Sequence, residues 1–183
     1  MAIRATVRFR ADDIWDTPED GNRYEVIDGQ LFVTPPPLIR HQRGAGGLYR
    51  HLAPHVHAQG LGSLFFAPVG LVLDEENGIQ PDLVFVSRER SGIISERAIE
   101  GAPDLIVEVL SPSTQARDRG IKMRRYARSG VPWYWILDPV GRALQEYRLA
   151  EQGYELIATS GPGSVFRPQL FTGVEIPIDD LWA

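Results

Sequence analysis

The segment 104-DLIVEVL-110 decides the fold, together with the two segments that follow it, 114-TQARDRGIKMRRYARS-129 and 133-WYWILD-138. The first and third are short apolar runs typical of buried strands, and the second has the periodicity of a helix that ends at Gly130. A strand, a helix and a second strand in this order favour a parallel pair joined by a right-handed crossover. The sequence therefore predicts a β-sheet with a helix on its face.

The remainder of the chain adds helices and strands around this unit. Residues 11–16 are predicted to form a short helix and residues 38–59 a long one, and Asp28-Gly29 between two β-rich runs predicts a hairpin. Further strands are expected over 64–73, 82–87, 143–149, 153–159, 164–166 and 174–178, with a loop over 88–102. This order predicts an α/β sandwich around a mixed, mostly antiparallel central sheet.

Composition excludes several classes of protein. The 183 residues, 43% hydrophobic and 23% charged, suit one globular domain, expected to span 1–183. Without cysteine there is no disulfide framework and no thiolate metal site, so the reducing cytoplasm is the expected compartment. The first residues lack the apolar core of a signal peptide, and no stretch is long and apolar enough for a membrane helix. The net charge of −5 argues against a protein coated in positive charge for nucleic acid, but it leaves room for a local basic patch or an acidic metal site.

Lysine is nearly absent from the chain. Of the 19 lysine and arginine residues, Lys122 is the only lysine. Such a bias is typical of genome composition, and a single surviving lysine can be chance. A compact ammonium and a planar guanidinium are not interchangeable, however, so Lys122 is also a candidate for a position where arginine cannot serve.

Glu108 lies in the middle of the strand that is predicted to be buried. A buried carboxylate must be protonated, ion-paired or bound to a metal, because its desolvation is costly. If the strand that begins at Asp82 pairs beside it, the two carboxylates come within roughly 5–8 Å and can share a hard cation such as Mg²⁺. Asp104 repeats the same Pro-Asp-Leu sequence, but it lies roughly 13 Å from Glu108 along their common strand, so it is expected to be a strand-start residue. A salt bridge to an arginine is the structural alternative for Glu108.

Lys122 lies on the predicted helix that directly follows the Glu108 strand. On a helical wheel Met123 and Tyr126 belong to the apolar face, and Lys122 lies at the flank of that face. A flanking lysine can lay its stem along apolar surface and carry its ammonium inward, where it would reach the carboxylates. A solvated lysine is the alternative.

Three stretches of the chain carry a resemblance to a known family. They are PDLVFVS at 81–87, PDLIVEVLSPST at 103–114 and RDRGIKMRRYARSGVPWYWILDP at 117–139. They resemble the Uma2 family of restriction-endonuclease-like proteins and the PD-(D/E)xK nuclease superfamily to which it is assigned. The resemblance implies a restriction-endonuclease-like α/β fold, in which helices flank a mixed central β-sheet and additional β-hairpins are present.

The resemblance also implies roles for individual residues. Asp82 and Glu108 would bind a divalent metal, Mg²⁺ or Mn²⁺, and Glu25, in the family's Tyr-Glu-x-Ile-Asp-Gly pattern, would be a further ligand or orient water. In the standard motif a lysine follows the acid by two positions, where this chain has Leu110. The catalytic lysine would then be Lys122, displaced onto the following helix.

The implied activity is metal-dependent hydrolysis of DNA phosphodiester bonds by an endonuclease. Arg119, Arg125 and His41 are candidates for weaker contacts with the nucleic acid. The alternative is a catalytically inactive nuclease fold that binds nucleic acid or protein, and a third reading is a hydrolase of smaller phosphate esters. The aromatic residues over 133–135 are either a base-stacking platform or core, and with open sheet edges they are compatible with a homodimer.

Overall fold

The computed structural model of the chain describes residues 7–183. The prediction that the chain starts without a signal peptide concerns a stretch that includes residues 1–6, which lie outside the described residues.

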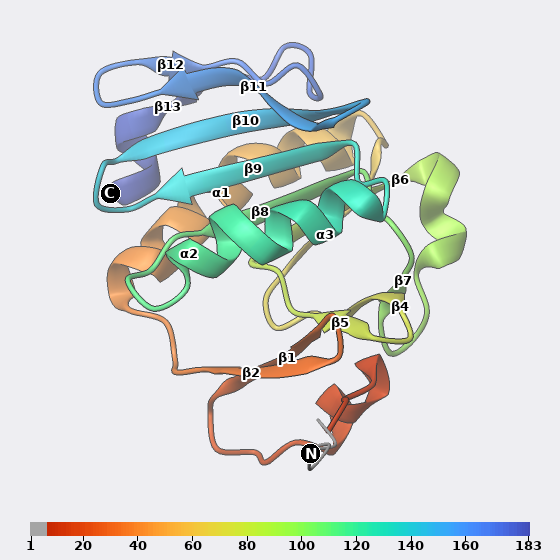
Figure 1. Cartoon of the computed structure of the whole chain (residues 1–183). Coiled ribbons are helices and arrows are strands. Elements are labelled where there is room, and N and C mark those ends of the chain that lie inside the picture. The colour runs from red at the N-terminus through yellow and green to blue at the C-terminus, as the bar shows by residue number, and fades with distance from the viewer. Residues whose placement is uncertain (1–6) are drawn as a thin grey trace.

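A six-stranded mixed sheet forms the larger layer (Figure 1). Its strand order is β11-β10-β9-β8-β6-β3. The strands are β3 (Gly62–Phe66), β6 (Leu83–Ser87), β8 (Leu105–Val109), β9 (Trp133–Asp138), β10 (Ala143–Ala150) and β11 (Gly153–Ser160). β8 and β9 are parallel, as the crossover predicted, and the other neighbours are antiparallel.

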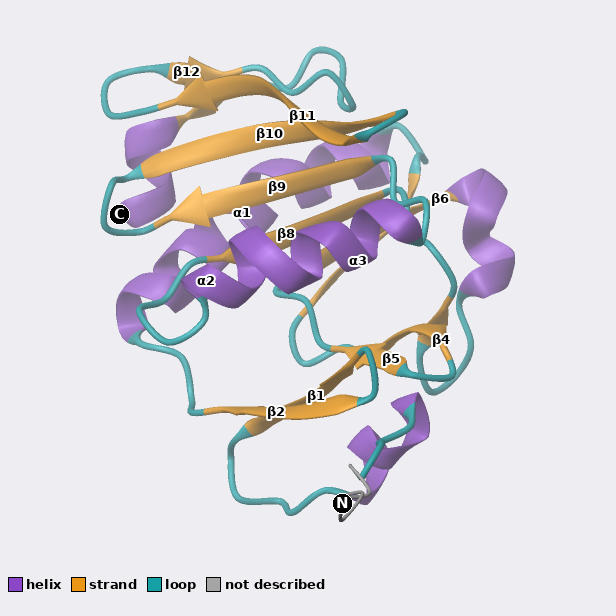
Figure 2. Cartoon of the chain, viewed as in Figure 1, coloured by secondary structure: helices purple, strands orange, loops and turns teal. Residues whose placement is uncertain are grey.

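A second, five-stranded mixed sheet lies below the first in Figure 2, with the order β2-β1-β5-β4-β7. Its strands are β1 (Arg23–Ile27), β2 (Gln30–Thr34), β4 (Leu71–Asp74), β5 (Asn77–Ile79) and β7 (Ile99–Glu100). The predicted hairpin is confirmed, because Asp28 and Gly29 both have positive φ, at 51° and 72°, as a two-residue hairpin turn requires. The resemblance implied one central sheet with additional hairpins. The hairpin of β1 and β2 instead belongs to this second sheet.

The single strand predicted over 64–73 is wrong. The run divides into β3 and β4, which belong to different sheets. Pro68 lies between them, and proline has no N–H to continue a ladder of strand hydrogen bonds. The chain therefore passes from one sheet to the other at this point.

Helices cover both faces of the six-stranded sheet, α1 behind it and α2 and α3 in front in Figure 1. α1 (Ile39–Ala58) matches the predicted helix and continues through Pro54. The helix predicted over 114–129 is instead three consecutive pieces, α2 (Gln115–Arg117), the π-helical turn η3 (Asp118–Lys122) and α3 (Met123–Arg128). π-turns widen the helix and occur often at functional sites.

Two apolar cores lie on the two faces of β8. Leu105, Val107 and Val109 face α1, while Ile106 joins Tyr126 of α3 on the other side. The prediction that this strand is buried is therefore confirmed.

The C-terminal 3-10 helix η4 (Ile178–Trp182) closes the first of these cores against α1. A Cβ at Gly47 would lie 2.6 Å from the carbonyl oxygen of Leu181, so η4 can approach α1 this closely only because residue 47 is glycine. Shorter elements complete the chain: the 3-10 helices η1 (Ala11–Asp16) and η2 (Arg88–Ile93), and the strands β12 (Val165–Phe166) and β13 (Ile176–Pro177).

The aromatic residues of β9 belong to the cores. Tyr134 and Trp135 are buried and Trp133 is half-buried against its neighbours, so the base-stacking reading of this strand is wrong. Between residues 7 and 183, no helix has the length and apolar character needed to cross a bilayer.

Candidate active site

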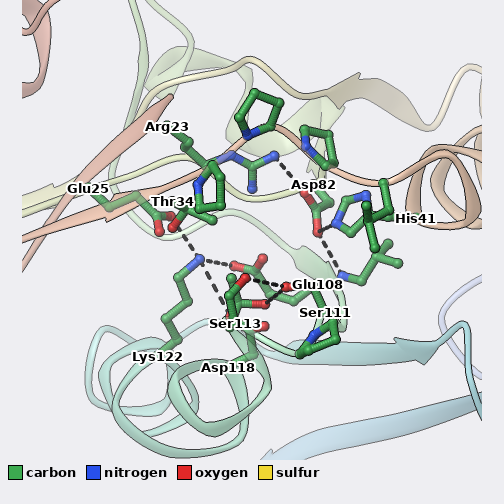
Figure 3. A pocket seen from close by; sticks show the side chains of 17 residues that line it. Arg23, Glu25, Thr34, His41, Asp82, Glu108, Ser111, Ser113, Asp118 and Lys122 are labelled. Carbon is green, nitrogen blue, oxygen red and sulfur yellow. Dashed lines mark hydrogen bonds and ion pairs between the residues drawn. The ribbon is translucent and has the colours of Figure 1, made fainter. Parts of the chain in front are cut away.

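A cavity of about 340 Å³ opens where β1, the end of β8, η3 and the start of α1 meet (Figure 3). The sequence segments around it are distant from one another, from Arg23 to Lys122. Charged and polar side chains converge on it, namely Arg23, Glu25, Thr34, His41, Asp82, Glu108, Ser111, Ser113, Thr114, Asp118 and Lys122. The remaining walls are formed largely by prolines.

Asp82, which directly precedes β6, and Glu108 of β8 lie at one end of the six-stranded sheet. Leu83 of β6 pairs with Val107 of β8, and this antiparallel register continues to place Asp82 beside Glu108. The backbone N–H of Val109 donates a hydrogen bond of 2.7 Å to Asp82 Oδ2. Both carboxylates are buried and both line the cavity, as the sequence predicted.

Asp82 is surrounded by basic groups. Arg23 Nη2 donates a hydrogen bond of 2.9 Å to Asp82 Oδ1, and His41 Nε2 lies 3.1 Å from Oδ2. Burial by itself would raise the pKa of Asp82, but the contact with His41 and the charge of Arg23 outweigh it and hold the pKa well below its usual range. Asp82 is therefore an anion at neutral pH.

Lys122 points into the cavity from η3 and is only 2% exposed. Its Nζ lies 2.8 Å from Glu25 Oε1 and 2.9 Å from Glu108 Oε1, and Asp118 Oδ1 is 3.8 Å away. The one lysine of the chain is thus the centre of an acidic cluster, which we define as Glu25, Glu108 and Asp118. The alternative of a solvated lysine is wrong.

The charges of this cluster influence one another. Burial alone would lower the pKa of Lys122, but the surrounding carboxylates raise it above its usual range, so the side chain is an ammonium rather than a base. Burial raises the pKa of Glu108 to about 8, because desolvation and the neighbouring acids outweigh the attraction of Lys122. Tyr126 donates a hydrogen bond of 2.6 Å to the same Glu108 Oε1 that contacts Lys122.

Three residues of the site were missed by sequence reasoning. Arg23 precedes Glu25 by two positions, and residues two apart on a strand share a face, which is the signal that could have placed it. Asp118 precedes Lys122 by four positions on a helical segment, a spacing that brings side chains together. Tyr126, four positions after Lys122, was assigned to the apolar face of the helix. The sequence gives no signal that its hydroxyl group would bond to Glu108, which belongs to another element.

Two of the three weaker candidates lie elsewhere. Arg125 forms ion pairs with Asp28 and, at 3.5 Å, with Asp74, and so joins α3 to the second sheet. Arg119 is exposed and donates a hydrogen bond of 2.7 Å to Gln145. His41 is the one candidate of this group that lines the cavity, through its contact with Asp82.

The donor groups fit a divalent cation that keeps part of its own water shell. Within residues 7–183, no three histidine, aspartate or glutamate side chains converge closely enough to form an all-protein cage. Asp82 and Glu108 are nevertheless paired at the cavity, and Asp118 Oδ1 is buried without a hydrogen bond. Mg²⁺ is commonly bound by one or two carboxylates while water and substrate phosphate complete its octahedron, so this arrangement fits it.

Comparison with known proteins agrees with the resemblance. The model of the Uma2 family, described as "Putative restriction endonuclease", matches residues 11–179. Among solved structures the chain is similar to "a putative nuclease belonging to DUF820 from Anabaena variabilis ATCC 29413", with a TM-score of 0.76 and 20% identity over 95% of this chain and 97% of that chain. At this identity the similarity is one of fold. No curated protein sequence matches the chain.

Proposed function

Because the chain belongs to the Uma2 family, we propose that it is a Mg²⁺- or Mn²⁺-dependent endonuclease that hydrolyses DNA phosphodiester bonds on a restriction-endonuclease-like fold. The observation that carries the proposal is the position of Lys122, whose ammonium lies 2.9 Å from Glu108 in the cavity that Asp82 also lines. An acid pair and a lysine together are the groups that the family motif requires. Here they come from three separate segments of the chain.

Asp82 and Glu108 would hold the metal ion, with Glu25 as a further acid beside Lys122. A bound Mg²⁺ or Mn²⁺ would polarise a phosphoryl oxygen and lower the pKa of water. Lys122 would supply positive charge where negative charge develops on the phosphate, and preorganised charge of this kind stabilises a transition state strongly. The hydrogen bond from Tyr126 would fix the orientation of Glu108.

Arg23 and His41 would orient the substrate. Both contact Asp82 and both line the cavity, so both could contact a phosphate that lies beside Asp82. Arginine binds phosphate oxygens with two parallel N–H groups, which gives direction as well as affinity. The proposal therefore adds Arg23 to the residues that the motif names.

A second function is favoured by one observation. The ammonium of Lys122 already lies against Glu25 and Glu108, and an ion-paired acid cluster can be a structural feature without metal. In that case the chain would be an inactive nuclease fold that binds nucleic acid. Its net charge of −5 would limit such binding to a local surface.

A cleavage assay separates the two functions. Purified protein would be incubated with supercoiled plasmid and with single-stranded DNA, in Mg²⁺ or Mn²⁺ and in EDTA. We expect metal-dependent cleavage that is lost in Glu108→Ala and Lys122→Ala. Arg148→Ala, an exposed arginine of β10 that lines neither cavity, is the matched control and should cleave normally.

The outcomes differ clearly. Cleavage that survives both cavity substitutions would mean that the activity does not come from this site. If no cleavage occurs and the protein binds DNA in a salt-dependent manner, the binding module is correct.

A further inference from the structure

A second cavity, of about 330 Å³, adjoins the candidate active site. The two cavities share three residues, Arg23, His41 and Asp82. The second cavity continues from these along α1 to the end of β3. It is lined further by Gln42, Ala45, Gly46, Tyr49, Arg50, Phe66 and Ala67. We call it the aromatic pocket.

Two aromatic rings form the wall of this pocket. The rings of Tyr49 and Phe66 meet edge to face, with their centroids 5.0 Å apart. Phe66 is 59% exposed, so its ring can be reached from solvent. Exposed aromatic surface beside a polar site commonly marks a place where a ligand binds.

The backbone ties the aromatic pocket to the candidate active site. The N–H of Ala67, the residue after Phe66, donates a hydrogen bond of 3.0 Å to the carbonyl oxygen of Asp82. Phe66 itself pairs with Leu83 across β3 and β6. A molecule that reached the Asp82 carboxylate would therefore have its neighbouring group next to the Phe66 ring.

We propose that the aromatic pocket is a subsite for one unpaired nucleobase of the DNA strand whose phosphate lies at Asp82. This inference rests on the proposed function, because the phosphate site defines where the adjoining base lies. Every nucleobase is flat and has a π-face that can stack on Tyr or Phe, whichever base it is. Gln42 and Arg50 at the rim supply an amide for a base edge and a positive charge for the next phosphate.

The subsite implies a preference among DNA substrates. In a duplex each base is stacked and paired, so it can enter the pocket only after it is flipped out of the helix, at an energetic cost. Single-stranded DNA, bulges and frayed ends carry bases that are already free. The chain is therefore expected to act on unpaired segments in preference to intact duplex.

Two substitutions test the pocket without disturbing the core. Phe66→Ala removes exposed ring surface, and Gly46→Leu fills the pocket from α1, where an added Cβ meets no atom within 4 Å. Leucine also favours a helix more than glycine does, so the second variant should fold at least as well as the native chain. Leu156→Ala on β11, where the leucine is 52% exposed, is the matched control for loss of apolar surface.

The experiment measures the affinity of fluorescein-labelled 12-nucleotide DNA by anisotropy in EDTA, where no hydrolysis occurs. The probes are a single strand of mixed sequence, the same strand with one abasic position, its duplex and the equivalent RNA. We expect Phe66→Ala and Gly46→Leu each to weaken single-strand binding about tenfold, to change duplex binding less than about twofold, and to abolish the effect of the abasic position. Leu156→Ala should match the native protein.

The results divide as follows. Unchanged single-strand affinity in both pocket variants, or equal losses on single strand and duplex, would overturn the subsite. Tighter binding to the RNA than to the DNA would overturn DNA as the source of the base. A parallel cleavage assay in Mg²⁺ separates the two proposals. If the native protein cleaves DNA but shows no base-dependent binding, only the subsite proposal fails. If binding depends on Phe66 but no cleavage occurs, only the proposal of endonuclease activity fails.

Discussion

The tripeptide Pro-Asp-Leu occurs twice in the chain, at 81–83 and at 103–105, and the two copies do different things. Asp82 lines the cavity with Glu108. Asp104 accepts a hydrogen bond of 2.7 Å from the backbone N–H of Ser87, and its carboxylate lies 3.6 Å from Arg90. The first copy is part of a candidate site and the second holds the start of a strand in place.

Strand direction explains the difference. Each tripeptide leads into a strand, β6 or β8, and the two strands are antiparallel neighbours. The two aspartates therefore lie at opposite ends of the pair. Only the end that contains Asp82 also has Glu108 and η3 next to it. The same tripeptide therefore contributes to a candidate site at one end and fixes the start of a strand at the other.

The largest effect on cleavage and stability is expected from substitution of Lys122, whose ammonium lies at the Asp82 end of the strand pair. Lys122→Met should abolish metal-dependent cleavage and lower the free energy of unfolding by about 3–5 kcal/mol, because it leaves buried carboxylates without their partner. Urea denaturation measures the stability. Adding Glu25→Gln to Lys122→Met should restore part of the stability but none of the activity, and a double variant as unstable as the single one would contradict the pairing.

The two aspartates themselves give the sharpest comparison. Asp82→Asn should reduce the rate of cleavage at least about 100-fold, since it removes a charge expected to hold the metal. Asp104→Asn should leave the rate within about twofold of the native value. Initial rates on a labelled oligonucleotide, measured at saturating Mn²⁺, provide the check, and equal losses in the two variants would remove the distinction between the two ends.

Stability gives a second comparison of these two positions. Asp104→Ala should lower the free energy of unfolding by about 1–2 kcal/mol, because the N–H of Ser87 loses a charge-assisted hydrogen bond. Asp82→Ala leaves Arg23 and the N–H of Val109 without their acceptor, so it should lower the free energy of unfolding by more than Asp104→Ala does. Thermal melting of both variants without metal compares them directly.

A pH dependence of stability is expected from Glu108. Its pKa of about 8 in the folded state is above the ordinary value of 4.5, so the folded state binds the proton more tightly than the unfolded state does. The corresponding stability is present at acidic pH and is lost as the pH rises through about 8. Glu108→Gln has no titrating carboxyl group at this position. Between about pH 6 and about pH 9 its free energy of unfolding should therefore fall by about 3 kcal/mol less than that of the native protein, at about 1.4 kcal/mol per pH unit below the pKa. Identical slopes would mean that Glu108 is ionised throughout this range.

Much of the β8 region follows from its sequence. The apolar alternation around Glu108, the parallel crossover to β9 and the inward position of the lone lysine were all predictable, because periodicity and helix spacing act between residues close in sequence. The hairpin at Asp28-Gly29 was predictable for the same reason, since only certain residues adopt positive φ readily.

Other features required the assembled molecule. Arg23 and Asp82 are 59 positions apart, and their contact depends on how the second sheet packs against the first. The division of 64–73 between two sheets, and with it the exposure of Phe66 beside Asp82, also depends on that packing.

The sequence by itself determined which residues are candidates for the chemistry, because burial and local spacing are encoded residue by residue. They are an acid within a buried strand, an acid that directly precedes the neighbouring strand, and one lysine on the next helix. The tertiary structure alone decided their surroundings. The contacts of Asp82 with Arg23 and His41, the acidic cluster around Lys122 and the aromatic pocket all join segments distant in the chain. Such contacts depend on the summed packing of both cores, which no local pattern records.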